Sequence, residues 1–200
     1  MRELAIRQPR VRVESSGPVP RRDFDGLFGH VLRPQGAFAS GLRAVGYDPE
    51  APLEHYPLTV WRAALEVARL HAHPQLPRAQ AYRQLGRQFV QGFSQTVVGR
   101  VFAAAASLIG ADNCLARLPT YLRAGRSDMQ LELRALGPRS WSARVQDPAP
   151  LPAFVAGVIE EVLRLTGVHP CVQVESQAEA QYSLSIRWEA PSERARERRD

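Results

Sequence analysis

Apolar residues recur at four-residue steps through the middle of the chain, and this spacing constrains the fold more than any other feature. The series runs Ala81, Leu85, Phe89, Phe93, Val97 and Val101. Side chains four positions apart share one face of an α-helix, so the series predicts a continuous apolar stripe on one long central helix over 77–109. Gly86, Gly92 and Gly99 interrupt it. Because each glycine costs about 1 kcal/mol against alanine inside a helix, they indicate that another backbone or a ligand comes close. We favour a close crossing of helices.

A different periodicity follows, in which apolar and polar residues alternate over 129–135. Alternation with a period of two predicts a half-buried strand, and Gly137-Pro138 predicts the turn into a partner strand over 141–145. An amphipathic helix over 154–165 and strands over 172–174 and 182–188 complete the pattern. Hairpins around one helix indicate an antiparallel sheet. The chain is therefore expected to be α+β, with an N-terminal helical half followed by a β-β-α-β-β antiparallel sheet.

The N-terminal half carries shorter signals. We expect a short strand over 25–32, helices over 37–45 and 58–72, and, beyond the long helix, one over 113–123 that Asp112 caps and Pro119 breaks or kinks. The predicted organisation is a flexible segment over 1–23, a single α+β domain over 24–189 and a charged disordered tail over 190–200.

Charge and apolar runs exclude several classes of partner. All 26 basic residues are arginine and the formal net charge is +6, but the arginines are scattered among acids. A nucleic-acid binder more often shows a basic face with aromatic or polar residues that read the bases, so we expect no nucleic-acid partner. The N-terminus has no signal-peptide core, and the longest apolar run, 101–109, is about half of a membrane span. We therefore expect a cytoplasmic protein with no membrane partner, in which Cys114 and Cys171 are small core residues.

The usual catalytic signatures are missing from the sequence. It has no GxSxG, HExxH or P-loop pattern, and Glu160-Glu161 is interpreted as a solvated helix face. A haem would need an axial ligand on a helix facing a pocket, whereas His71, beside His73, is expected at a solvated helix end. We accordingly expect no enzyme, no metal site and no cofactor, haem included.

A series of short motifs, each occurring once, extends from 24 to 188. They are Gly26-Leu27-Phe28, Gly46-Tyr47-Asp48, Tyr56-Pro57, Trp61, Leu85-Gly86-Arg87-Gln88-Phe89, Gly92-Phe93, Thr96, Gly99-Arg100, Phe154-x-x-Gly157 and Tyr182-x-x-x-x-Arg187-Trp188. In their order and spacing the chain resembles the myxobacterial paralogous family DUF2378, which implies a bacterium with many copies of the domain and no assigned chemistry. The order of elements also resembles haem-NO-binding and vinyl-reductase-type sensor domains, whose helical and sheet layers enclose a ligand.

These observations favour a non-catalytic sensory or regulatory module that binds a small ligand or a protein partner. A ligand would lie between the helical layer and the sheet, and an arginine directly after a glycine suits a bidentate contact with a carboxylate or phosphate. The candidate ligand-binding residues are Trp61, Arg87, Phe89, Gly92, Phe93, Thr96 and Arg100. The apolar members suit a core equally well, and the arginines suit surface ion pairs. The alternative is a homodimeric interaction or scaffold domain that uses the apolar stripe or an open sheet edge.

Overall fold

A computed structural model describes residues 18–125 and 128–189 of the chain. The expected flexible segment before residue 18 and the expected tail over 190–200 lie outside these residues. The helical half contains β1 (Val19–Pro20), α1 (Arg21–Phe24), the π-helix η1 (Asp25–Leu32), α2 (Gly36–Ala44), β2 (His55–Tyr56), α3 (Leu58–Ala72) and α4 (Arg78–Phe93). The second half contains α5 (Val97–Gly125), β3 (Gln130–Gly137), β4 (Ser140–Gln146), α6 (Pro152–Arg164), β5 (His169–Gln177) and β6 (Gln181–Glu189).

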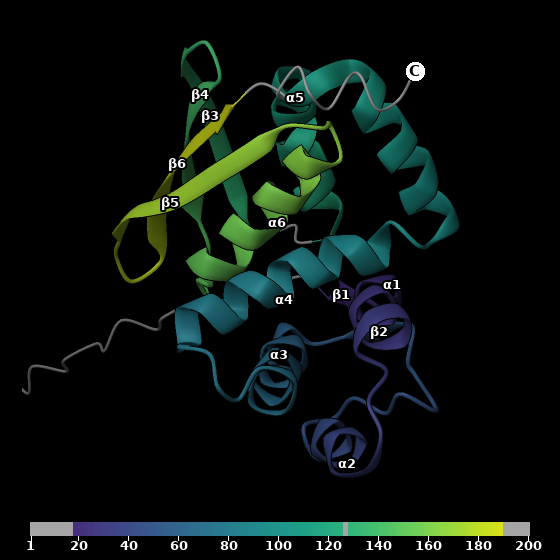
Figure 1. Ribbon diagram of the computed structural model, residues 1–200. Coiled ribbons are helices and arrows are strands. Elements are labelled where there is room, and N and C mark those ends of the chain that lie inside the picture. Colours follow the sequence, from purple (N-terminus) through teal and green to yellow (C-terminus); the bar gives the residue numbers. More distant parts are fainter. Residues whose placement is uncertain (1–17, 126–127, 190–200) are drawn as a thin grey trace, which may run out of the picture.

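The α+β prediction is confirmed. Four antiparallel strands form a sheet in the order β3-β4-β6-β5, with α6 against one face (Figure 1). Val145 of β4 pairs with Leu131 of β3 and with Tyr182 of β6. The inward positions of the strands are buried because alternate side chains of a strand point to the same face. They are Ala143, Val145, Val172, Leu184 and Ile186.

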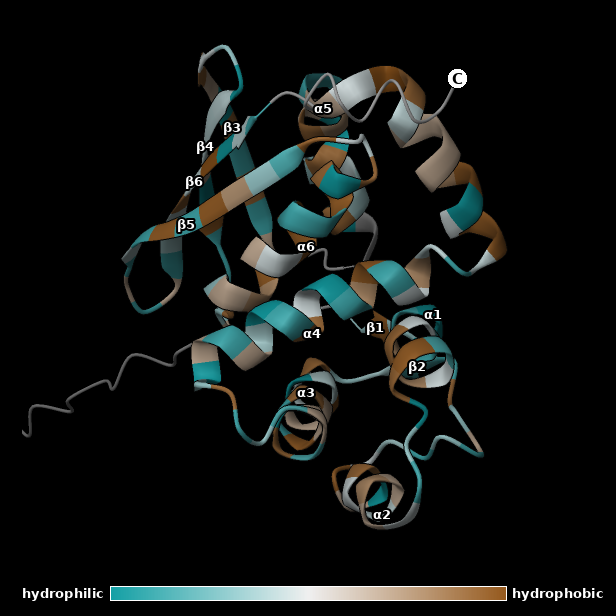
Figure 2. Ribbon diagram, in the orientation of Figure 1, coloured by the Kyte–Doolittle hydropathy of each residue, from teal (hydrophilic) through white to brown (hydrophobic). Residues whose placement is uncertain are grey.

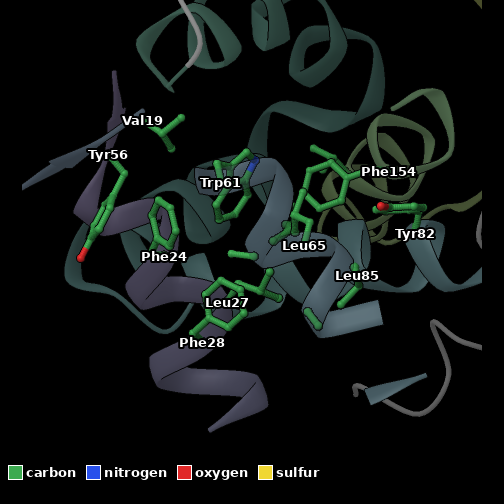
Figure 3. Packing of buried hydrophobic residues seen from close by; sticks show 14 of the residues in the cluster. Val19, Phe24, Leu27, Phe28, Tyr56, Trp61, Leu65, Tyr82, Leu85 and Phe154 are labelled. Carbon is green, nitrogen blue, oxygen red and sulfur yellow. The ribbon is translucent and has the colours of Figure 1, made fainter. Parts of the chain in front are cut away.

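Helix α4 crosses the middle of the molecule, between the rest of the helical half and the sheet half (Figure 1). It contacts α6 on one side and η1 and α3 on the other. Below it lies an aromatic core in which Phe24 packs between Tyr56 and Trp61, with ring centroids 4.5 and 4.8 Å away (Figure 3). Trp61 in turn contacts Phe154 of α6, at 6.3 Å between centroids. The aromatic core therefore extends from α1 to α6.

Helix α6 belongs to both hydrophobic cores. Phe154, Val158 and Val162 face the helical half, whereas Ile159 and Leu163 face the sheet. Nine of its residues are buried, which makes it the central element of the sheet half.

Two predictions for the N-terminal half are wrong. The segment 25–32 is the π-helix η1, not a strand. Gly26, Leu27 and Phe28 are buried in succession, which a strand with one face on the core does not do. In addition, residues 18–23, expected in the flexible segment, are part of the fold, since Val19 is 1% exposed and pairs with Tyr56.

The prediction of a single long helix over 77–109 is also wrong, because α4 ends at Phe93 and α5 begins at Val97. The Oγ1 of Thr96 accepts a hydrogen bond from the Gly99 N–H at 3.0 Å, which is the geometry of a helix N-cap. The apolar stripe divides at this corner. Leu85 is fully buried, whereas Val97 and Val101 are 71% and 68% exposed.

Helix α5 changes direction at Gly110, whose φ of 79° and ψ of 172° are not helical. The break is not at Pro119, and Asp112 is not a cap, since its Oδ1 accepts a hydrogen bond from the Trp141 Nε1 at 2.8 Å. The helical segment 97–123 is long and apolar enough to cross a membrane by length and composition, and 28% of its most apolar 18-residue window is buried. The apolar part before the break, 97–109, spans about 20 Å at 1.5 Å per residue, short of the bilayer core of about 30 Å.

Candidate functional site

A cavity of about 260 Å³ lies between the helical half, α5 and α6. Residues of α3, α4, α5 and α6 contribute most of its wall. The lining side chains are mostly apolar, and they are Val19, Trp61, Phe89, Val90, Phe93, Val98, Phe102, Leu118, Tyr121, Leu122, Met129, Leu151, Phe154, Val155, Val158 and Val162, with Arg22, Asp23, Arg62 and Asp147.

Six aromatic rings line the cavity in two clusters. Trp61, Phe89 and Phe154 form the first, with ring centroids 5.8 to 6.3 Å apart. In the second, Phe102 contacts Phe93 at 6.0 Å and Tyr121 at 4.9 Å. The first cluster comes from α3, α4 and α6, and the second from the end of α4 and both arms of α5. The corner between α4 and α5 therefore brings the two clusters together around one space.

The polar part of the wall holds two arginines and two aspartates. Arg62 donates hydrogen bonds to the carbonyl oxygens of Ala149 and, at 3.1 Å, Pro150. The Oδ1 of Asp147, which is 2% exposed, accepts a hydrogen bond from the Ala149 N–H at 3.0 Å. Arg62 thus holds the loop between β4 and α6 against α3, and Asp147 bonds within that loop.

Asp23 is in a different situation. Its side chain is 15% exposed, and the nearest cation is the Arg22 Nε at 3.8 Å, beyond hydrogen-bond distance. Among the described residues, no side chain or backbone N–H donates a hydrogen bond to its carboxylate. Burial raises the pKa of Asp23 to about 6, and the Arg22 guanidinium offsets part of that rise. The cavity therefore has one lining carboxylate with its acceptor positions available.

The structure brings three of the seven candidate residues together. Trp61, Phe89 and Phe93 line the cavity. Gly92 does not, since it packs on η1, where a Cβ added to it would lie 1.8 Å from the carbonyl oxygen of Gly26. Thr96 is the cap of α5 described above.

The two candidate arginines lie outside the cavity wall. The Arg87 Nη2 is 2.7 Å from the Glu160 Oε2, and the Arg83 Nη1 is 3.5 Å from the Oε1 of the same carboxylate. Glu160 is 3% exposed, so its interpretation as a solvated face is wrong. Its carboxylate links α4 to α6. Arg100 is exposed on α5.

The sequence interpretation missed the polar residues of the site and half of its aromatic ones. Phe102, Tyr121 and Phe154 belong to three segments that the sequence does not connect. Asp23 was placed in the expected flexible segment. Its position directly before Phe24 and the Gly26-Leu27-Phe28 motif was the one signal in the sequence that it could belong to the domain. Only the fold shows that it faces a cavity.

No metal-binding group is evident within residues 18–125 and 128–189, where no three His, Cys, Asp or Glu side chains gather. All five histidines lie in these ranges, and none of them lines the cavity. Cys114 is buried and Cys171 is exposed, so the prediction of a core position is wrong for Cys171. Burial raises the pKa of the Cys114 thiol to about 11.

Residues 18–189 match the model of a family described as "Protein of unknown function (DUF2378)". No curated protein matches the chain in sequence. Among solved structures, an oxygen-binding H-NOX domain related to soluble guanylate cyclases, in its oxygen complex, has a TM-score of 0.64 at 15% identity, over 85% of this chain and 93% of that one. A structure titled for modulating haem redox potential through porphyrin distortion has a TM-score of 0.64 at 16% identity, over 85% and 93%. An Fe(II) unliganded mutant H-NOX protein from K. algicida has a TM-score of 0.63 at 11% identity, over 86% and 98%.

Proposed function

Because the chain belongs to the DUF2378 family and shares the fold of H-NOX domains, we propose that it is a non-catalytic sensory module that binds a small, mainly apolar molecule in the cavity. The observation that carries the proposal is the cavity itself, lined by aromatic clusters from both halves of the fold. Ligand pockets are typically apolar spaces of about 300–1,000 Å³ with a few polar groups. A cavity of about 260 Å³, just below that range, suits a small molecule.

Helix α5 provides a physical route from the cavity to the surface. Phe102 lines the cavity and is half-buried, while Val101 and Leu108 of the same arm are 68% and 85% exposed. A ligand that fills the cavity therefore changes the packing of a helix whose other face is available to a partner. If α5 has two positions, a ligand that binds one of them more tightly would shift the population of the protein toward that position.

The residues of the cavity do not fit a haem. The usual axial ligands are His, Cys, Met paired with His, or Tyr, and the lining residues include neither His nor Cys. Met129 has no histidine opposite it, and the Tyr121 ring packs edge-on against Phe102. We therefore propose a ligand other than haem.

The test is to purify the full chain from its native host, record its absorbance from the near ultraviolet to the red, and analyse the denatured extract by mass spectrometry. We expect one small molecule at about one equivalent and no haem absorbance. A cavity-filling variant, Val158→Trp, should lose the molecule, whereas Leu70→Trp, at an exposed position of α3 outside the cavity wall, should retain it. A stoichiometric haem, or a molecule that survives Val158→Trp in a folded protein, would contradict the proposal.

A second candidate function is self-association through the outer face of α5. Val97, Val101, Ala104 and Leu108 follow the 4-3-4 spacing of a helix–helix seam and are all exposed. Figure 2 shows that this arm of α5 is mainly hydrophobic. Arg100 is the only charged residue over 97–109. A second copy of the chain offers the same uncharged seam, as a two-fold interface requires.

Sedimentation equilibrium tests this interface. The seam predicts a dimer that Val101→Glu converts to a monomer, because a carboxylate cannot be buried in an uncharged seam without a partner. Leu70→Glu is the control, since Leu70 is 53% exposed on α3, outside the seam. A monomer at every concentration, or a dimer that tolerates Val101→Glu, would rule the seam out.

A further inference from the structure

The shape and lining of the cavity restrict the chemistry of its ligand. An apolar cavity of about 150 Å³ in another protein holds one benzene molecule. A cavity of about 260 Å³ therefore has room for a ring or short chain and one small polar group. The aromatic clusters would contact the ring or chain of the ligand, and the polar residues of the wall would bind its polar group.

The four polar lining residues do not contribute equally. The Arg62 guanidinium already donates to two carbonyl oxygens, and the Asp147 carboxylate already accepts from a backbone N–H. The side chain of Arg22 is 60% exposed, whereas that of Asp23 is 15% exposed. The polar group held inside the wall with acceptor positions available is the Asp23 carboxylate.

A carboxylate in an apolar wall favours a cationic partner. An amine with its N–H groups directed at Asp23 would form charge-assisted hydrogen bonds, which are among the stronger ones in proteins. Aromatic faces also attract ammonium groups, and the six rings of the cavity surround the remaining space. A ligand carboxylate would instead be repelled by Asp23.

We propose that the cavity selects small apolar molecules that carry one protonated amine, and that the amine binds the Asp23 carboxylate. This inference rests on the proposed function, because it specifies the ligand of the same cavity. It assigns to Asp23 a specificity role that is distinct from the apolar contacts made by Trp61, Phe89 and Phe154.

Three probes that share a phenethyl group and carry a cationic, neutral or anionic end group test the proposal on the full chain by isothermal titration calorimetry near neutral pH. They are phenethylamine, phenethyl alcohol and hydrocinnamate, with toluene as the uncharged apolar reference. We expect the amine to bind at least about tenfold more tightly than the alcohol, and hydrocinnamate to bind more weakly than both. Asp23→Asn should remove the preference for the amine and keep binding of the alcohol.

Asp25→Asn is the matched control, because Asp25 lies two residues away and pairs with Arg21 at 3.1 Å, outside the cavity wall. It should retain the preference for the amine. Equal affinities for amine and alcohol, tightest binding of hydrocinnamate, or an amine preference that persists in Asp23→Asn would each overturn the inference. If toluene binds in those cases, the proposed function stands. If none of the four probes binds, both proposals fail.

Discussion

Gly86 of α4 and Gly157 of α6 let the two helices cross in backbone contact. A Cβ on Gly86 would lie 2.1 Å from the carbonyl oxygen of Phe154, and one on Gly157 would lie 2.0 Å from the carbonyl oxygen of Arg83. Real Cβ atoms do not approach an oxygen so closely, and neither contact can be relieved by rotating a side chain. This crossing sets the distance between Phe89 and Phe154, and with it one wall of the cavity.

Gly86→Ala should therefore destabilise the protein by at least about 2 kcal/mol, because the methyl group forces α4 and α6 apart. Urea unfolding followed by circular dichroism measures this change. Gly29→Ala in η1 is the control, since a Cβ there meets nothing within 4 Å and alanine favours a helix. Equal stabilities for the two variants would show that the crossing is not close.

The buried Glu160 predicts a second effect on stability. Arg87→Ala removes the arginine at 2.7 Å and leaves a carboxylate that is 3% exposed with Arg83 as its remaining ion-pair partner. Breaking a buried ion pair on one side typically costs about 3–5 kcal/mol, and we expect about 2–3 kcal/mol because Arg83 stays. The matched change Arg164→Ala removes a partly exposed pair with Glu161 and should cost less than about 1 kcal/mol.

Asp23 predicts an unusual dependence of stability on pH. Its pKa is raised from 3.8 to about 6 in the folded protein, so the folded state holds the proton more tightly than the unfolded one. The free energy of unfolding therefore falls as the pH rises from about 4 to about 6. Above about pH 6 the carboxylate is ionised in both states, and the full cost of burying its charge lowers the stability of the fold.

Asp23→Asn removes this penalty. The variant should be more stable than the parent at about pH 7.5, by up to about 3 kcal/mol for a shift of about two pKa units, and equally stable below about pH 4. Arg22, Arg62 and Asp147 share the cavity wall and are unchanged in both proteins. A stability difference that is independent of pH would contradict the raised pKa of Asp23.

The two cysteines should differ in reactivity. Cys114 is 1% exposed and burial raises the pKa of its thiol to about 11, so little thiolate forms near neutral pH. Cys171 lies exposed on β5. Titration of the folded protein with a thiol reagent should therefore modify one cysteine, and Cys171→Ser should abolish the reaction whereas Cys114→Ser should not.

The fold class was readable from the sequence to a large extent. Helix α3 matches its prediction at both ends, and the hairpins β3–β4 and β5–β6 lie where the alternation predicts them. The order of the motifs also led to the correct family. Periodicity succeeds at these places because it records which face of an element is buried, and each element is long enough to show it.

The site was predicted only in part, and the reason is visible at Thr96 and Asp23. The four-residue spacing continues from Phe93 to Val97 through the corner, since periodicity along the chain does not report where a helix changes direction. The side chain of Thr96 caps a new helix there. That corner lets Phe102 contact Phe93 and line the same cavity as Phe89, far from where a straight helix would carry it.

The sequence by itself determined the helical half, the antiparallel sheet and the presence of close backbone contacts at Gly86 and Gly92, because these follow from local geometry and residue size. Only the tertiary structure decided that Arg87 pairs with Glu160 and that Asp23 faces a cavity. Such contacts join residues far apart in the chain, and their partners are selected by how the two halves pack, for which no local spacing carries a signal.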